Sequence, residues 1–158
     1  MIDPVVRRAR GDDAGALEAL EDEARAALVD ARGGARWLEE HPAVGPGWVA
    51  AVETGTVFVA VLSDPAPGGV DGVELLVGYL VLVVDGGVAR IDQVFVTPGA
   101  RELGFGDTLI EVATDAARAA GATVIEGEAL PGDRETKNLY ERAGITARLI
   151  TVSRRLDS

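Results

Sequence analysis

The chain has 158 residues, 47% of them hydrophobic, which is enough for a single domain over residues 1–158 with one sizeable core. It has no cysteine and one histidine, which excludes disulfides, thiolate catalysis, Cys-ligated zinc and a His-rich metal site. Its formal net charge of −11 disfavours nucleic acid as a partner and favours a cationic substrate, although acidity also serves solubility alone.

The start of the chain and its hydropathy bear on location. No stretch is long and apolar enough to predict a membrane span, and the opening residues MIDPVVRRAR lack the apolar core of a secretory signal. We therefore expect a cytoplasmic protein with no membrane partner.

The first half of the chain predicts a strand, two helices and a β-rich region. Residues 5–10 read as the strand, and residues 11–13 offer an N-cap for a helix whose acidic face, including Glu21, we expect to be solvated. A short helix is predicted over 35–40, while the Pro- and Gly-rich residues 41–47 are predicted to be irregular. Residues 49–52 and 56–62 are β-rich runs, typical of strand edges or a hairpin.

The second half predicts a hairpin and then a strand–helix–strand unit. Strands over 74–84 and 88–96 are joined by a turn at 85–87, after a flexible connection over 63–72. A helix over 104–120, a strand over 123–129, a helix capped by Asp133 and ending at Gly144, and a last strand over 146–156 follow. The sequence therefore predicts an α/β (α+β) fold with a mixed, mostly antiparallel sheet flanked by helices.

Residues 101–106, RELGFG, lie between the strand that ends near Val96 and the helix that follows. A helix start leaves its first N–H groups without intrahelical partners, so a glycine turn there can accept phosphate oxygens. An ordinary strand-to-helix turn is the alternative. A Rossmann-type site is disfavoured, because Leu109 stands where its third glycine is required.

Two motifs carry a resemblance to a known family. Arg-x-x-Gly-x-Gly at residues 101–106, preceded by Val96-x-Pro98, resembles the acyl-CoA-binding motif of the GNAT N-acetyltransferase superfamily. Residues 138–145, NLYERAGI, resemble that family's xLYExxGF helix end. The specific part of the resemblance is residues 91–145. It implies that the strands over 91–96 and 123–129 splay apart to admit the acyl-CoA arm.

The resemblance also implies which residues hold acetyl-CoA, the expected acyl donor. Its pyrophosphate is expected on residues 103–107 and its pantetheine along the preceding strand, with no metal involved. A tryptophan at Gly106 is expected to block binding without unfolding the domain. The expected cofactor residues are Val94, Phe95, Val96, Arg101, Glu102, Leu103, Gly104, Phe105, Gly106, Asp107 and Asn138.

Catalytic roles follow from the same resemblance and from the carboxylates nearby. Tyr140 matches the family position whose phenol protonates the leaving thiolate. Asp92, three residues before Phe95, is the first candidate for the general base, and the other candidates are Glu74, Glu126 and Glu128.

Several residues are candidates to contact the acceptor. Glu126 and Glu128 share a strand face and either bind a cationic acceptor or are solvated. Trp48, like Trp37, lines the acceptor site or packs in the core, and His41 is interpreted as a surface residue.

We therefore expect an N-acetyltransferase that moves an acetyl group from acetyl-CoA to a primary amine of a small molecule or peptide, by direct attack in a ternary complex. One alternative is a non-catalytic acyl-CoA sensor or regulatory module, and another is an interaction protein that has lost the ligand.

The last strand offers an edge through which a homodimer can form. Asp133 departs from the family pattern, which has asparagine there, and the residues left after Gly144 are few for the usual terminal hairpin.

Overall fold

Five strands form one sheet in chain order in the computed structural model, which describes residues 3–64 and 73–157. The strands are β1 (Val5–Arg8), β2 (Thr56–Asp64), β3 (Val73–Asp85), β4 (Val88–Val96) and β5 (Val124–Gly127). The first four pair antiparallel, and β5 pairs parallel with β4. The prediction of a mixed, mostly antiparallel sheet flanked by helices is confirmed.

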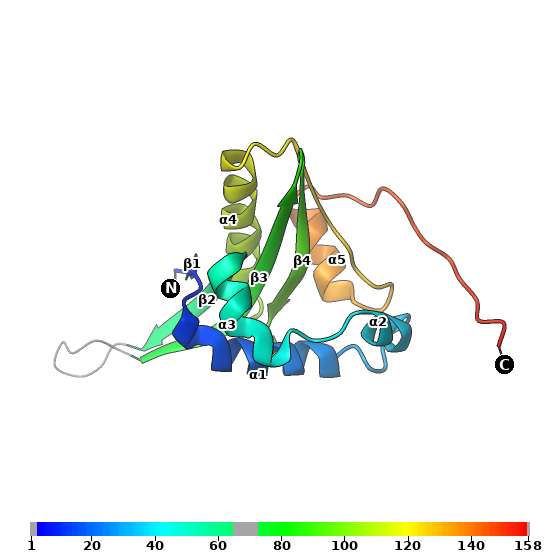
Figure 1. Ribbon diagram of the computed structural model, residues 1–158, viewed down its shortest axis with the longest axis horizontal. Helices are drawn as coiled ribbons and strands as arrows, with labels where there is room; N and C mark the ends of the chain where they lie inside the picture. Colours follow the sequence, from blue (N-terminus) through cyan, green and yellow to red (C-terminus); the bar gives the residue numbers. More distant parts are fainter. Residues whose placement is uncertain (1–2, 65–72, 158) are drawn as a thin grey trace.

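Helices cover both faces of the sheet (Figure 1). They are α1 (Ala14–Ala26), α2 (Gly34–Glu40), α3 (Trp48–Thr54), α4 (Phe105–Ala119) and α5 (Arg134–Arg142), with short 3-10 helices η1 (Gly11–Asp13), η2 (Gly45–Gly47) and η3 (Pro98–Ala100). Within the described residues, every helix is too short or too polar to cross a bilayer.

Alternation along β2 divides the interior into two clusters. Phe58 and Ala60 face the cluster that contains α4 and α5, while Val57 and Val59 face the cluster that contains α1 and α3. Successive strand residues point to opposite faces, so a continuous apolar run fits a strand that is covered on both sides. The sheet is therefore the middle layer of three.

The predicted β-rich run over 49–52 is wrong, because these residues belong to helix α3. Trp48, Ala51 and Val52 all pack in the cluster with α1. Their spacing of three and four residues is the period of a helix, and it buries one face of this short segment.

The predicted last strand is also absent from the described residues. Residues 145–157 contain no strand, and the large aliphatic side chains after Ile145 are exposed. Most of the predicted connection over 63–72 lies outside the described residues, since β2 continues to Asp64 and β3 starts at Val73.

Two local predictions are confirmed where side-chain or turn chemistry decides them. The β3–β4 hairpin turns at Gly86, which has φ +61°. The Asp133 carboxylate accepts the Thr136 N–H at 3.2 Å at the start of α5. Both features place β4, β5 and α5 around the candidate site.

Candidate active site

Strands β4 and β5 separate halfway along β4. Their last paired residues are Ile91 and Gly127, so residues 92–96 of β4 have no partner in β5. The register of β4 against β3 also shifts here, because Val81 pairs with Gln93 and Leu82 with Ile91, which leaves Asp92 as a bulge. The predicted splay is confirmed, and it leaves free backbone groups along one edge of β4.

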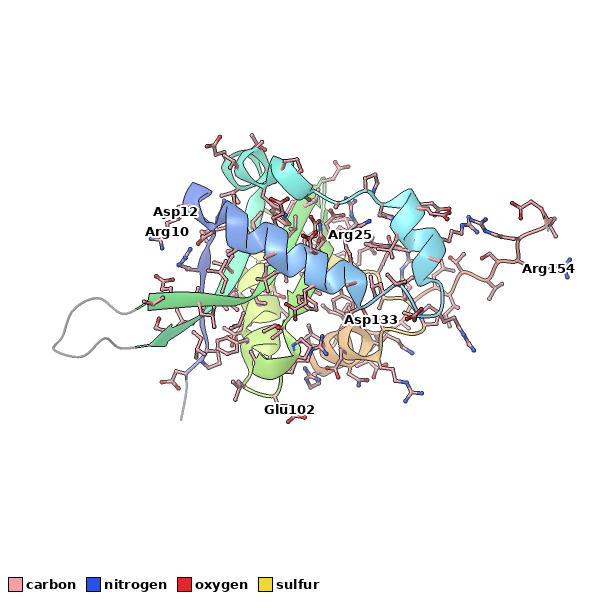
Figure 2. All side chains as sticks on the ribbon, turned by 90° about the horizontal axis from the view of Figure 1, so that it is seen from below. Arg10, Asp12, Arg25, Glu102, Asp133 and Arg154 are labelled. Carbon is pink, nitrogen blue, oxygen red and sulfur yellow. The ribbon has the colours of Figure 1, made fainter. Side chains whose placement is uncertain are left out.

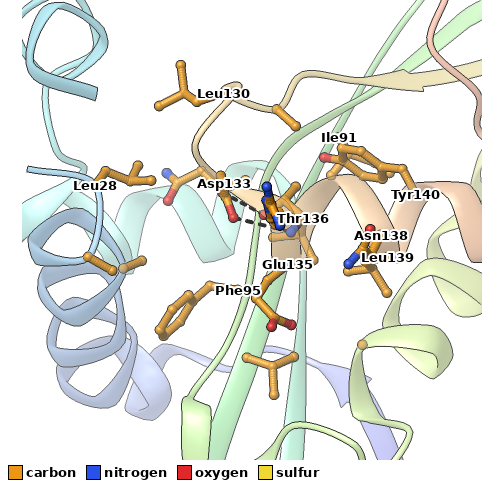
Figure 3. A pocket seen from close by; sticks show the side chains of 18 of the residues that line it. Leu28, Ile91, Phe95, Leu130, Asp133, Glu135, Thr136, Asn138, Leu139 and Tyr140 are labelled. Carbon is orange, nitrogen blue, oxygen red and sulfur yellow. Dashed lines mark hydrogen bonds between the residues drawn. The ribbon is translucent and has the colours of Figure 1, made fainter. Parts of the chain in front are cut away.

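A cavity of about 840 Å³ fills the space between the separated strands. It extends from the first turn of α4 past β4 to the loop before α5, and Figure 3 shows Phe95, Asn138 and Tyr140 around it. Ten of the eleven predicted cofactor residues line it. They are Val94, Phe95, Val96, Arg101, Glu102, Gly104, Phe105, Gly106, Asp107 and Asn138, so Leu103 is the exception.

The backbone before α4 turns sharply at two residues with positive φ. Gly104 has φ +89°, and Glu102, with φ +70°, is the one non-glycine residue of this kind in the described part of the chain. A positive φ is unfavourable for a side chain such as glutamate, and such strain gathers at functional sites. Figure 2 shows Glu102 at the edge of the molecule, beside the start of α4.

The N–H groups at this helix start have no partner within residues 3–64 and 73–157. No side chain caps Gly104, and no hydrogen bond is donated by the backbone of residues 103–107 to those residues. With the partial positive charge of a 15-residue helix behind them, these groups are suited to an anion such as a diphosphate.

Two arginines modify the charge beside the helix start. Arg142 of α5 donates to the Asp107 carboxylate at 3.0 Å and so offsets its negative charge. Arg101 donates through Nε to the Val96 carbonyl at 3.0 Å, and its guanidinium lies 5.7 Å from the centre of the Phe95 ring. The Arg101 charge is thus held at the end of β4, beside the cavity.

Gly106 lines the cavity and also faces α5. A Cβ atom there would come within 3.1 Å of Leu139 Cδ1 in α5. The expectation that a tryptophan at Gly106 blocks binding without unfolding the domain stays a prediction, and Leu139 would have to move to admit the larger side chain.

Tyr140 lies where the two strands begin to separate. Its ring covers Gly127, where an added Cβ would come 2.6 Å from the Tyr140 hydroxyl. The side chain is buried. Its hydroxyl oxygen makes no hydrogen bond to the described residues and keeps part of its surface accessible. Burial, and secondly the charges of Asp133 and Glu128, raise the pKa of the Tyr140 phenol. The phenol therefore stays protonated at neutral pH.

The candidate bases lie in different places. Asp92 lines the cavity, is 47% exposed and has Arg90 Nη2 at 3.5 Å from its carboxylate. Glu128 also lines the cavity, whereas Glu126 on β5 does not. The Glu74 carboxylate accepts a hydrogen bond from Nε of Arg7, on β1, at 3.1 Å. Because Glu74 lies outside the cavity lining, it is excluded as the general base.

The two tryptophans differ in their surroundings. Trp48 is 1% exposed, packs edge-on against Tyr79 and is absent from the cavity lining, so it lies in the core and not on the cavity wall. Trp37 is half-buried, stacks on His41 with ring centres 4.4 Å apart and lines the cavity together with it.

Sequence reasoning missed the role of Glu21, which was expected to be solvated and is 1% exposed. Its carboxylate accepts four N–H groups at 3.0 to 3.2 Å, from Val44 N, Gly45 N, Trp48 Nε1 and Gln93 Nε2. It therefore joins α1 to the 44–48 region and to β4. Helical spacing from Leu17 to Glu21 is the signal that could have identified it as inward-facing.

The comparisons with known proteins agree with this geometry. The model of the Acetyltransferase (GNAT) family matches residues 17–145. A search of curated proteins finds no match.

Solved structures are similar over nearly the whole chain. A tetramutant of the BH1408 protein from Bacillus halodurans is 18% identical with a TM-score of 0.72, covering 96% of this chain and 99% of that one. An acetyltransferase from Trypanosoma brucei is 19% identical with a TM-score of 0.64, covering 98% and 100%. The aminoglycoside N-acetyltransferase AAC(6')-Iy in complex with CoA is 16% identical with a TM-score of 0.62, covering 97% and 95%. At these identities the likeness shows the fold.

Proposed function

The chain belongs to the GNAT acetyltransferase family, and from this premise we propose that it transfers an acetyl group from acetyl-CoA to a primary amine. The observation that carries the proposal is the continuity of the site. N–H groups at the start of α4 that have no partner among the described residues open onto a cavity that follows the free edge of β4 to the Tyr140 hydroxyl. Along acetyl-CoA, the diphosphate needs the N–H groups, the amide-containing arm needs the free strand edge, and the thioester needs the hydroxyl, in this order.

The donor is proposed to bind through backbone groups for most of its length. The N–H groups of residues 103–107 bond the diphosphate, and Arg101 adds positive charge beside them. The pantetheine amides pair with the free edge of β4 at residues 92–96, as an added strand would. Asn138, which lines the cavity from α5, is a further donor or acceptor for this arm.

The proposed reaction is a direct transfer within a ternary complex. The neutral amine nitrogen attacks the thioester carbonyl carbon, and a backbone N–H near Phe95 or Val96 stabilises the oxygen as it gains negative charge. The carbon–sulfur bond then breaks, and Tyr140 gives its proton to the leaving thiolate. The proton lost by the amine passes to Asp92, directly or through water.

The proposed acceptor is an amine of a small molecule or peptide that is cationic in solution and gives one proton to solvent before its neutral nitrogen attacks. Glu128 and Asp92 line the cavity, and the formal net charge of the chain is −11. Aminoglycosides are reasonable first candidates, because one of the solved structures with a similar fold is that of an aminoglycoside N-acetyltransferase.

The test is release of free CoA thiol from acetyl-CoA in the presence of a panel of amines, including aminoglycosides, polyamines and peptides with a free amino group. Amine-dependent release that exceeds hydrolysis without amine is the expected result. Binding of acetyl-CoA without release with any amine would favour the alternative, a non-catalytic acyl-CoA sensor. Absence of binding would contradict both.

A further inference from the structure

One part of the cavity is lined by apolar side chains, and we call it the apolar chamber. The backbone continues as a turn beyond the end of α1, because Leu28 N donates to the Arg25 carbonyl at 3.0 Å. Residues spaced by four and three positions therefore share one face there. Figure 3 shows Leu28, Phe95 and Leu130 around this part of the cavity. The chamber is formed by Ala24, Leu28, Ala31, Trp37, Phe95 and Leu130.

Two hydrogen bonds fix α1 along β4 and so place the chamber. Gln93 Nε2 donates to the Glu21 carboxylate at 3.2 Å, and Thr97 Oγ1 donates to the Glu23 carboxylate at 2.6 Å. Phe95 lies between Gln93 and Thr97 in the chain, shares their face of the strand and packs in the cluster with α1. The chamber therefore lies on the α1 face of the sheet.

The aromatic wall of the chamber is held in place by hydrogen bonds within the protein. Trp37 stacks on His41, and His41 Nδ1 donates to the Trp37 carbonyl at 2.9 Å, because a carbonyl oxygen can only accept. Arg25 donates to the His41 carbonyl at 2.7 Å and to the Leu38 carbonyl at 3.2 Å. A wall that is fixed in this way binds a flat ligand with little further loss of conformational entropy.

Two loops meet at the end of the chamber. A Cβ atom added at Gly132 would lie 2.6 Å from Arg32 N, and one added at Gly33 would lie 3.4 Å from Leu130 Cδ2. Ala31 and Gly132 line the cavity from the two loops, so the cavity is bounded where the loops touch. The chamber therefore fits the body of a small molecule better than a continuing peptide chain.

The occupant of the chamber is the acceptor rather than the donor. Phe105 at the start of α4 and Tyr140 of α5 belong to the cluster on the opposite face of the sheet from the chamber. A donor held by these two helices brings its thioester to β4 from that face. The acceptor then approaches from the α1 face, where the chamber lies.

Charge orients the acceptor in the cavity. The six side chains of the chamber are uncharged, and the cationic Arg25 lies beside them, whereas the Asp92 carboxylate lines the cavity from β4. An ammonium group is therefore directed toward Asp92, and an apolar group toward the chamber. An aminoglycoside would place hydroxyl and amino groups against the apolar wall without partners, which is unfavourable.

We propose that the acceptor is an arylalkylamine, a primary amine joined to an aromatic ring by a short aliphatic linker. This inference rests on the proposed acetyl transfer and names its substrate class. The ring packs in the chamber against Trp37 and Leu28, and the nitrogen lies between Asp92 and the thioester. The nitrogen–carbon bond forms as the carbon–sulfur bond breaks, the amine proton passes to Asp92, and the thiolate takes the proton of Tyr140.

The first test compares kcat/KM for three acceptors with saturating acetyl-CoA. They are 2-phenylethylamine, ethylamine and the aminoglycoside kanamycin. We expect 2-phenylethylamine to exceed ethylamine by at least roughly 30-fold, because only its ring is buried in the chamber, and to exceed kanamycin as well. Transfer to kanamycin or ethylamine at an equal or higher kcat/KM would overturn the arylalkylamine assignment and leave the acetyltransferase intact. Transfer to no amine would contradict the proposed function itself.

The second test changes the chamber. Trp37→Ala and, separately, Leu28→Asp are expected to lower kcat/KM for 2-phenylethylamine at least roughly tenfold, mainly through KM, and to change it for ethylamine less than about twofold. Acetyl-CoA affinity by calorimetry should stay unchanged, which shows that each variant is folded. The matched control is Val29→Asp, next to Leu28 but 57% exposed and outside the cavity lining. Equal losses for both amines, or an equal loss in the control, would contradict the chamber as the ring site.

Discussion

Tyr140 combines two properties that a general acid requires. Its phenol is kept neutral, since burial and nearby carboxylates raise its pKa, and its hydroxyl is free to bond a ligand within the cavity. A proton held in this way can be given to a thiolate as it leaves.

Tyr140→Phe is expected to lower kcat on the order of 100-fold, because the thiolate must then leave without a positioned proton donor. The affinity for acetyl-CoA and the thermal stability should change little, as the hydroxyl has no partner in the described structure. The raised pKa means that the phenol keeps its proton to higher pH than a free tyrosine, whose pKa is 10.0. The pH profile of kcat should accordingly show no loss from Tyr140 below about pH 10. Unchanged turnover in the variant would remove Tyr140 from this role.

Glu21 acts on the fold rather than on the reaction. Glu21→Gln replaces one accepting oxygen by an NH₂ group and leaves buried N–H groups facing another donor, so we expect the free energy of unfolding to fall by roughly 2–4 kcal/mol. Glu18→Gln, on the exposed side of the same helix, should change it by less than about 0.5 kcal/mol. Urea unfolding measures both, and equal effects would contradict the role given to the buried carboxylate.

At the scale of elements, the start of α4 determines how the donor binds. Leu103 is 40% exposed and lies beside the free N–H groups, so Leu103→Glu adds a negative charge where the diphosphate is proposed to bind. The affinity for acetyl-CoA should fall at least roughly tenfold through charge repulsion. A carboxylate at a helix start is favourable to the helix, so the melting temperature should not fall.

The matched control for this variant is Leu103→Gln, which has a similar size and no charge. It should bind acetyl-CoA almost as the unaltered chain does, and added salt should reduce the difference between the two variants. Equal binding by both would show that the start of α4 does not hold the anion.

Elements with strong local signals could be predicted from the sequence. Turn glycines defined the β3–β4 hairpin, and Asp133 marked the start of α5. Helix α3 could not be distinguished from a strand, because seven residues rich in valine and alanine carry too little periodicity to decide. The segment over 146–156 has the composition of a strand but no partner among the described residues, and pairing is a property that composition does not reveal.

At the scale of the whole molecule, the site depends on where the sheet opens. The β3–β4 hairpin and the parallel pair were predicted from the sequence, and the resemblance to the GNAT family implied the splay beside Phe95. Two acceptor-site candidates did not reach the cavity, since Trp48 is turned into the core by α3 and Glu126 lies on the still-paired part of β5. The direction in which a single side chain points depends on such packing, which one sequence does not specify.

The most direct test of the account is calorimetric titration of the unaltered chain with acetyl-CoA and, in parallel, with S-acetylpantetheine, which has the same thioester arm but no diphosphate. We predict one acetyl-CoA bound per chain, with an affinity higher than that for S-acetylpantetheine by roughly two orders of magnitude or more, because only acetyl-CoA reaches the N–H groups of residues 103–107. No heat of binding with acetyl-CoA, or equal affinity for the two compounds, would contradict it.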